Sequence, residues 1–197
     1  KTGNDVGVFG RISFLIFIVV LGIESARQTV ARLKKGRRVE ELEQFALNDS
    51  MTGMYNRNAY DYFVKNEKDF EGYVIVTFDL NNLKQCNDQY GHRAGDEYII
   101  NAAHIIEDNF ERYGKCYRIG GDEFCCIIPK GRYFKIERVM HKIDQDVEIL
   151  NHKNIIPVPV GIAYGYAVFT EDDTDPEKVR ERADEDMYRN KKAMKQS

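Results

Sequence analysis

Three carboxylates have the clearest potential for chemistry. Asp79 ends the apolar run YVIVTFD at 73–79, while Asp122 and Glu123 stand between a Gly-Gly pair and the apolar run FCCIIP. If the first run lies beside the second, the acids converge at one sheet edge, where a carboxylate needs a cation or hydrogen-bond donors to offset its desolvation. Mg²⁺ takes one or two carboxylates together with waters and substrate phosphates. The pattern therefore predicts a magnesium site that includes Asp79 and Glu123.

Simpler interpretations of these acids stay open. Gly120-Gly121 between two β-prone runs is typical of a hairpin turn, because glycine accepts positive φ, and acids beside such a turn are usually solvated. Asp79 could instead cap the turn that follows its strand.

The polar segment after Asp79 carries groups that suit a guanine nucleotide. Residues 80–83 offer backbone N–H groups to a phosphate. Asp96 can accept from both N1–H and N2–H₂ of guanine, which adenine lacks, and the amide of Asn87 can both donate and accept. Alternatively, Asp96 caps a helix that begins at Gly95.

Two lysines near the C-terminus could bind phosphate. Lys191 and Lys195 are four residues apart in a helical segment and share one face. Like charges at that spacing repel weakly, whereas a bound triphosphate would make the pair favourable. A solvated basic face is the alternative.

These residues require a sheet with helices to position them. The run 73–79 is apolar on both faces, which predicts a central strand covered on both sides. Apolar residues recur at three- and four-residue steps in 94–110 and 133–150, which predicts helices there, with a polar loop between 79 and 94. The segment 157–169 alternates large residues with Gly, Ala and Pro, so one face must pack closely against a neighbour. A last helix opens at Asp175-Pro176-Glu177. The order predicts an α+β sandwich.

The composition is that of an ordinary globular protein. The chain has 197 residues, 31% of them charged and 43% hydrophobic, with a net charge of −3, which does not favour a nucleic-acid partner. Four cysteines stand in apolar runs without metal-ligand spacing, so we expect reduced core residues.

The N-terminal residues have a different character. The segment 6–23 is apolar except for Arg11 and Ser13, and basic residues follow it, as on the cytoplasmic side of a membrane span. A buried or partner-packed helix is the alternative. The segment 24–48 is charged and helical in pattern, which indicates a connector able to pair with a second copy.

The chain resembles the GGDEF family of diguanylate cyclases. Its motifs in order are DSMTGMYNR at 49–57, DLNNLKQCNDQYGHRAGD at 79–96, GGDEF at 120–124 and ADEDMYRNKKAMK at 183–195. The resemblance covers 49–197. With the N-terminal patterns it predicts three parts: 1–23, an apolar transmembrane segment; 24–48, a helical connector; and 49–197, the catalytic domain.

The resemblance implies a nucleotidyl-cyclase or polymerase-palm-like α+β sheet with an antiparallel hairpin, flanked by helices and preceded by an N-terminal helical segment. Two GTP-loaded domains of a homodimer, joined through 24–48 and facing active sites, would release two pyrophosphates and form cyclic di-GMP with Mg²⁺ or Mn²⁺. The protein would sit at the inner (cytoplasmic) membrane with its catalytic domain in the cytoplasm, or in the cytosol if 6–23 is not embedded. The implied site residues are Asp79, Glu123 and the Leu80 carbonyl for metal, Asp79, Asp122 and Glu123 for catalysis, and Asn87, Asp96, Leu83, Gly120, Gly121, Lys191 and Lys195 for GTP.

Two positions depart from the family's pattern. Asn81 stands where an acid is frequent, which leaves the site less negative. Glu111 and Gly114 stand where the family's Arg-x-x-Asp product-inhibition site would begin and end, so we expect no inhibition through that site. A non-catalytic GTP or cyclic di-GMP binding module on the same fold is the alternative function.

Overall fold

The chain forms two units, Lys1–Phe45 and Ala46–Ser197, and the second contains every candidate site residue. The computed structural model describes residues 21–25, 27–28, 46–131 and 136–194.

The N-terminal predictions fall largely outside these ranges. Within the predicted apolar segment 6–23 and connector 24–48, only residues 21–25, 27–28 and 46–48 are described, and the first two of these stretches are helical. Both assignments therefore stay predictions. In the described parts of the chain, no helix has the length and apolar character needed to cross a bilayer.

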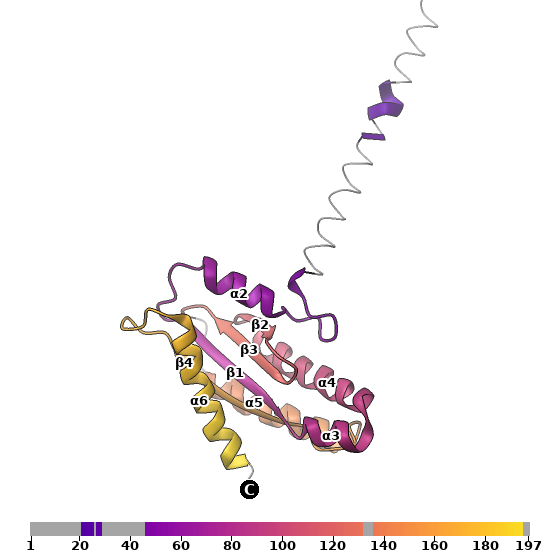
Figure 1. Cartoon of the computed structure of the whole chain (residues 1–197), viewed down its shortest axis with the longest axis vertical. Coiled ribbons are helices and arrows are strands. Elements are labelled where there is room, and N and C mark those ends of the chain that lie inside the picture. The colour runs from indigo at the N-terminus through magenta and orange to yellow at the C-terminus, as the bar shows by residue number, and fades with distance from the viewer. Residues whose placement is uncertain (1–20, 26, 29–45, 132–135, 195–197) are drawn as a thin grey trace, which may run out of the picture. The chain divides into compact units, whose positions relative to one another are not determined.

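The second unit contains both helices and strands, which Figure 1 labels. The elements are α2 (Arg57–Asn66), β1 (Val74–Asn81), α3 (Leu83–Tyr90), α4 (His92–Phe110), β2 (Lys115–Arg118), β3 (Glu123–Ile128), α5 (Ile136–His152), β4 (Gly161–Val168) and α6 (Pro176–Met194).

The four strands form one antiparallel sheet in the order β2-β3-β1-β4. β1 lies in the centre, and its residues Val74–Phe78 are buried, as the apolar run predicts. With helices flanking this sheet, the predicted α+β fold class is confirmed.

Side chains of β1 alternate between two cores, because successive residues of a strand point to opposite faces. Val74, Val76, Phe78 and Leu80 pack with α4 and α5, and most of the apolar residues predicted for these helices are buried. The start of the second predicted helix, 133–135, lies outside the described residues. Ile75 packs on the other face with residues of α2 and α6. All four cysteines are buried and free, as expected for core residues.

The small-residue face of β4 lies against α6, which Figure 1 shows running beside the strand. A Cβ at Gly165 would lie 2.0 Å from the backbone nitrogen of Met187 and 2.4 Å from the Ala183 carbonyl oxygen. The prediction of a close neighbour on this face is therefore confirmed. The strand is shorter than predicted: Asn151 bonds to both the N–H and the carbonyl of Val160, and β4 begins only at Gly161.

Backbone groups at both edges of the sheet form hydrogen bonds with residues outside the sheet. At the β4 edge, the Tyr166 N–H donates to Asp186 at 3.2 Å, and Arg182 donates to the Val168 carbonyl at 2.9 Å. At the β2 edge, Tyr55 donates to the Cys116 carbonyl at 3.2 Å and accepts from the Arg118 N–H at 2.7 Å.

Candidate active site

Asp79 and Glu123 face each other across the β1–β3 pair. They are register partners in the antiparallel ladder, so their side chains leave the same face of the sheet. Asp79 is largely buried, with 16% of its side chain exposed, and Glu123 is exposed to solvent. The structure thus brings together the two acids that the sequence singles out. The alternative for Asp79 is wrong, since the cap of α3 is Asn82, and Asp79 contacts another partner.

That partner is Lys191 of α6. Its ammonium forms a hydrogen-bonded ion pair with the Asp79 carboxylate, and only a quarter of the lysine side chain is exposed. The sequence suggested a phosphate ligand here, and the contact with Asp79 was not anticipated. Lys195 lies outside the described residues.

The loop between β2 and β3 is the turn of an antiparallel hairpin, as the Gly-Gly pair predicted, but it does not use the backbone conformation that favours glycine. Gly120 and Gly121 both have φ outside the positive region, so backbone freedom does not explain them. A Cβ on Gly120 would lie 3.0 Å from the Glu123 carboxylate oxygen, whereas one on Gly121 would meet nothing within 4 Å. Gly120 therefore leaves room for Glu123, and Gly121 leaves its surroundings open to a ligand.

The same loop is fastened to β1. The Leu80 N–H donates to the Asp122 carbonyl at 3.1 Å. This bond fixes Asp122 beside the strand that carries Asp79. It also occupies one of the four backbone N–H groups of residues 80–83 that the sequence offered to a phosphate.

Arg118 also organises this loop, although the sequence did not single it out. Its guanidinium donates to the carbonyls of Gly120 at 3.2 Å and Gly121 at 2.8 Å, and to Asp49 at 3.0 Å. Burial raises the pKa of Asp49, but hydrogen bonds from Thr52 and Arg118 outweigh it and hold that pKa below its usual value. Asp49 is therefore kept ionised as the partner of Arg118.

The two candidate guanine residues lie on neighbouring helices. Asn87 is on α3, within the segment predicted to be a loop, and Asp96 is exposed on α4. A Cβ on Gly95 would lie 2.0 Å from the side-chain oxygen of Asn87, so the carboxamide packs directly against the residue before Asp96. The alternative that Asp96 caps its helix is wrong, because α4 begins at His92 after the cap Gly91.

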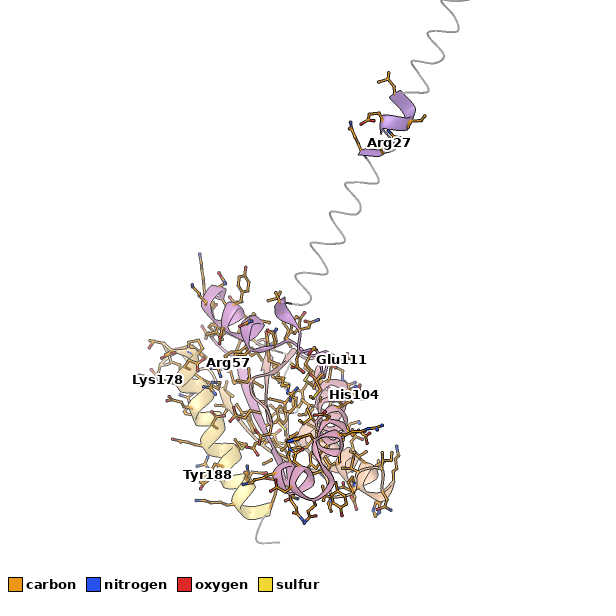
Figure 2. The ribbon with its side chains drawn as sticks, turned by 45° about the vertical axis from the view of Figure 1, so that its right-hand side comes forward. Arg27, Arg57, His104, Glu111, Lys178 and Tyr188 are labelled. Atoms are coloured by element: carbon orange, nitrogen blue, oxygen red, sulfur yellow. The ribbon has the colours of Figure 1, made fainter. Side chains whose placement is uncertain are left out.

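The positions of the family's inhibitory motif have their own structural roles. Glu111 is exposed at the C-terminal end of α4, where Figure 2 labels it. A Cβ on Gly114 would lie 2.1 Å from the Ile127 carbonyl oxygen, so no larger side chain fits there without movement of β3.

The oxygen donors on this face suit a hard divalent cation. Two facing carboxylates and the adjacent Leu80 carbonyl match the few protein ligands that Mg²⁺ takes when it keeps waters and substrate phosphates. Among the described residues, no group of three or more His, Cys, Asp or Glu forms a full protein cage. The donor set therefore fits a cation that is held jointly with a phosphate substrate.

Comparison with known proteins places this arrangement in a family. The family described as "Diguanylate cyclase, GGDEF domain" matches residues 46–197. The bifunctional diguanylate cyclase/cyclic di-GMP phosphodiesterase MucR of Pseudomonas aeruginosa is 30% identical over 180 residues, covering 82% of this chain and 26% of the relative. The diguanylate cyclase DgcS of Shewanella oneidensis is 29% identical over 158 residues, covering 77% of this chain and 52% of the relative.

The fold is also similar to that of a solved GGDEF domain. The coiled coil and GGDEF domain of DgcB from Caulobacter crescentus, in complex with c-di-GMP, superposes with a TM-score of 0.75 at 22% identity and covers 88% of this chain and 95% of that one. The chain spans about half or less of the length of the two curated relatives. Through residues 46–197, the chain belongs to the GGDEF domain family of diguanylate cyclases.

Proposed function

We propose that residues 46–197 form a diguanylate cyclase that condenses two GTP molecules into cyclic di-GMP in a homodimer with Mg²⁺. The observation that carries the proposal is the register pairing of Asp79 with Glu123, which puts two carboxylates on one sheet face beside Lys191. The relatives named as cyclases support the reaction class.

The chain's own groups would bind and orient each nucleotide. Asp79, Glu123 and the Leu80 carbonyl would hold the cation, which when bound screens the charge at the α-phosphate and lowers the pKa of the attacking hydroxyl. The Asn87 amide would donate and accept hydrogen bonds at the guanine edge, and the Asp96 carboxylate would accept them.

Other groups would handle the triphosphate. Lys191 and Lys195 would neutralise its charge, together with the N–H of Leu83. The open space at Gly121 and the missing side chain at Gly120 would let phosphate approach the loop. Lys191 would exchange Asp79 for a phosphate when cation and nucleotide arrive, so that neither charge is left unpaired.

The chemical step is a displacement at phosphorus that occurs twice. The 3′-oxygen of one GTP bonds to the α-phosphorus of the other, and the bond to the pyrophosphate oxygen breaks. The proton of the 3′-hydroxyl passes to a carboxylate of the signature, Asp122 or Glu123. Two such steps between facing domains release two pyrophosphates and close the ring.

The test incubates the full chain with GTP and Mg²⁺ and measures cyclic di-GMP and pyrophosphate. Turnover per chain should rise with protein concentration, because two loaded domains must meet. Asp79→Asn and Glu123→Gln should each lower turnover by about 100-fold or more, since each removes charge that faces the reacting phosphate. Asp61→Asn, an exposed acid on α2, is the matched control and should keep full turnover.

Tight GTP binding without product, at concentrations where the chain is dimeric, would refute the cyclase and leave the alternative, a nucleotide-binding signalling module. Equal turnover in Asp79→Asn and Asp61→Asn would refute the role given to the β1–β3 acids. Cyclic di-GMP should not inhibit through Glu111 and Gly114, and inhibition that is abolished by changing those residues would contradict this expectation.

A further inference from the structure

A buried tyrosine hydroxyl joins the ends of β1 and β4. Tyr98 of α4 is fully buried. Its hydroxyl donates to the Asn81 carbonyl at 2.5 Å and accepts from the Gly161 N–H at 2.7 Å. Asn81 and Gly161 are register partners, so one phenol holds both strands at the point where their pairing ends.

This bridge lies between the two halves of the candidate site. Asn81 follows Asp79 by two residues, and Asn82, with φ of 63°, then turns the chain from β1 into α3. Tyr98 follows Asp96 by two residues on α4. The hydroxyl thus connects the helix that bears the candidate guanine acid to the strand that bears the candidate metal acid.

A second contact links α3 to α4, so that β1, α3 and α4 are connected in a ring. The side chain of Asn87 on α3 packs against Gly95 on α4, three residues before Tyr98. From β1 the chain passes through the turn at Asn82 to α3, from α3 by packing to α4, and from α4 through the hydroxyl back to β1. The hydroxyl adds a directional hydrogen bond at the end of β1, whereas the other contacts of α4 with β1, such as Phe78 with Phe110, are apolar.

The hydroxyl is chemically suited to a fixed role. Burial raises the pKa of Tyr98 well above its usual value, and the carboxylate of Asp79 adds to this effect, so the phenol keeps its proton. It can then donate and accept at once, which satisfies two backbone groups. Phenylalanine has the same ring and would leave both groups without this partner.

We infer that Tyr98 is a positioning residue, whose hydroxyl sets the distance between the guanine-binding and metal-binding groups within each domain. The inference rests on the proposed cyclase function. Because a misplacement of about 1 Å can lower a reaction rate by about 100-fold, the loss falls on turnover. Guanine binding itself keeps all its contacts.

The test compares Tyr98→Phe with Tyr60→Phe in the full chain. Tyr60 is a matched control because it is also buried, and its hydroxyl donates to Glu177 at 3.2 Å, between α2 and α6. Tyr98→Phe should lower kcat by about tenfold or more, with the KM for GTP and the Kd of a non-hydrolysable GTP analogue changed by less than about threefold. Tyr60→Phe should keep kcat even if it lowers the melting temperature equally.

A second readout does not depend on turnover. Amide hydrogen exchange of residues 81–83 and 161 should become faster in Tyr98→Phe and stay unchanged in Tyr60→Phe. In the unmodified chain, the Tyr98 hydroxyl proton should exchange slowly enough to be observed by NMR, which tests the bridge even if a variant folds poorly.

The outcomes separate the two proposals. A chain that makes no cyclic di-GMP refutes the proposed function, and with it the catalytic part of the inference, while the exchange measurements still decide whether the bridge exists. If the chain is active, equal kcat values for the two variants overturn the positioning role. Weaker analogue binding at unchanged kcat overturns it as well, because Tyr98 would then serve guanine affinity. Unchanged exchange at Gly161 in Tyr98→Phe refutes the bridge itself.

Discussion

Gly165 lies where β4 and α6 come closest, and replacing it by alanine tests how the helix is held on the sheet. The added Cβ would lie 2.0 Å from the Met187 nitrogen, 2.4 Å from the Ala183 carbonyl oxygen and 2.7 Å from the Asp186 carbonyl carbon. All three obstacles are backbone atoms of one helix, so no rotation of a side chain can relieve the contact. The helix must retreat from 2.0 Å to an ordinary separation of 3.4 Å or more.

The expected loss of stability follows from two opposing effects. Overpacking a well-packed core costs about 1–3 kcal/mol, and a rigid backbone obstacle favours the upper end of that range. Alanine in place of a strand glycine recovers about 0.5–1 kcal/mol of backbone entropy. The net loss should therefore be about 2 kcal/mol, which lowers the melting temperature of a domain of this size by about 4–8 °C.

The assay is thermal and urea unfolding of Gly165→Ala beside Gly161→Ala. A Cβ on Gly161, on the same face of β4, would meet only the Asn81 side chain at 3.2 Å, so that variant should lose no more than about 1 kcal/mol. Because α6 carries Lys191, Gly165→Ala should also lower GTP turnover more than its stability loss explains. If the two variants are equally stable, the inference that the α6 backbone packs directly against Gly165 is wrong.

Three further predictions concern charges. Asn81→Asp adds a carboxylate on the face of β1 that carries Asp79. Calorimetry should detect roughly tenfold tighter Mn²⁺ binding, because ligand charge sets cation affinity. Unchanged affinity would show that residue 81 does not contribute to the cation site. Lys191→Met removes the ammonium that pairs with Asp79, so Mn²⁺ should bind the nucleotide-free protein more tightly while GTP binds more weakly, and equal Mn²⁺ affinity would contradict the exchange of partners proposed for Lys191. Hydrogen bonds from Arg182 hold the pKa of Asp173 well below its usual 3.8, so this carboxylate adds stability above pH 3.8 that is lost as the pH falls further. Asp173→Asn should therefore be less stable near neutral pH and show a flatter decline below pH 3.8 in urea titrations, and a decline as steep as in the unmodified chain would argue against this pair.

Elements with a strong apolar pattern could be predicted from the sequence. The steps of three and four in α4 and α5 coincide with buried residues such as Ile106 and Ile143, and the Asp175-Pro176-Glu177 start of α6 is as expected. The alternating small residues of β4 indicated a close neighbour without identifying it. Such patterns arise because burial repeats along one helix or strand, so they can be recognised within a single segment of the sequence.

The missed features depend on weak patterns or distant partners. α3 buries only Leu83 and Cys86, which is too few apolar residues to reveal its period. Tyr98 bonds to Asn81, 17 positions away in the chain, and Arg118 is held by Asp49, 69 positions away. Their roles follow from tertiary contacts, so neither motif nor periodicity could have indicated them.

The hydrogen bonds at the edges of the sheet bear on how two copies can join. An exposed strand edge is a template on which another chain can add a strand. Here α6 side chains bond two backbone groups of β4, and the Tyr55 backbone bonds two of β2. These bonds would have to break before the edges of two domains could pair at those groups, whereas side chains and bound nucleotides could bring a reactive pair together without breaking them. An assembly of that kind can come apart once its product is released.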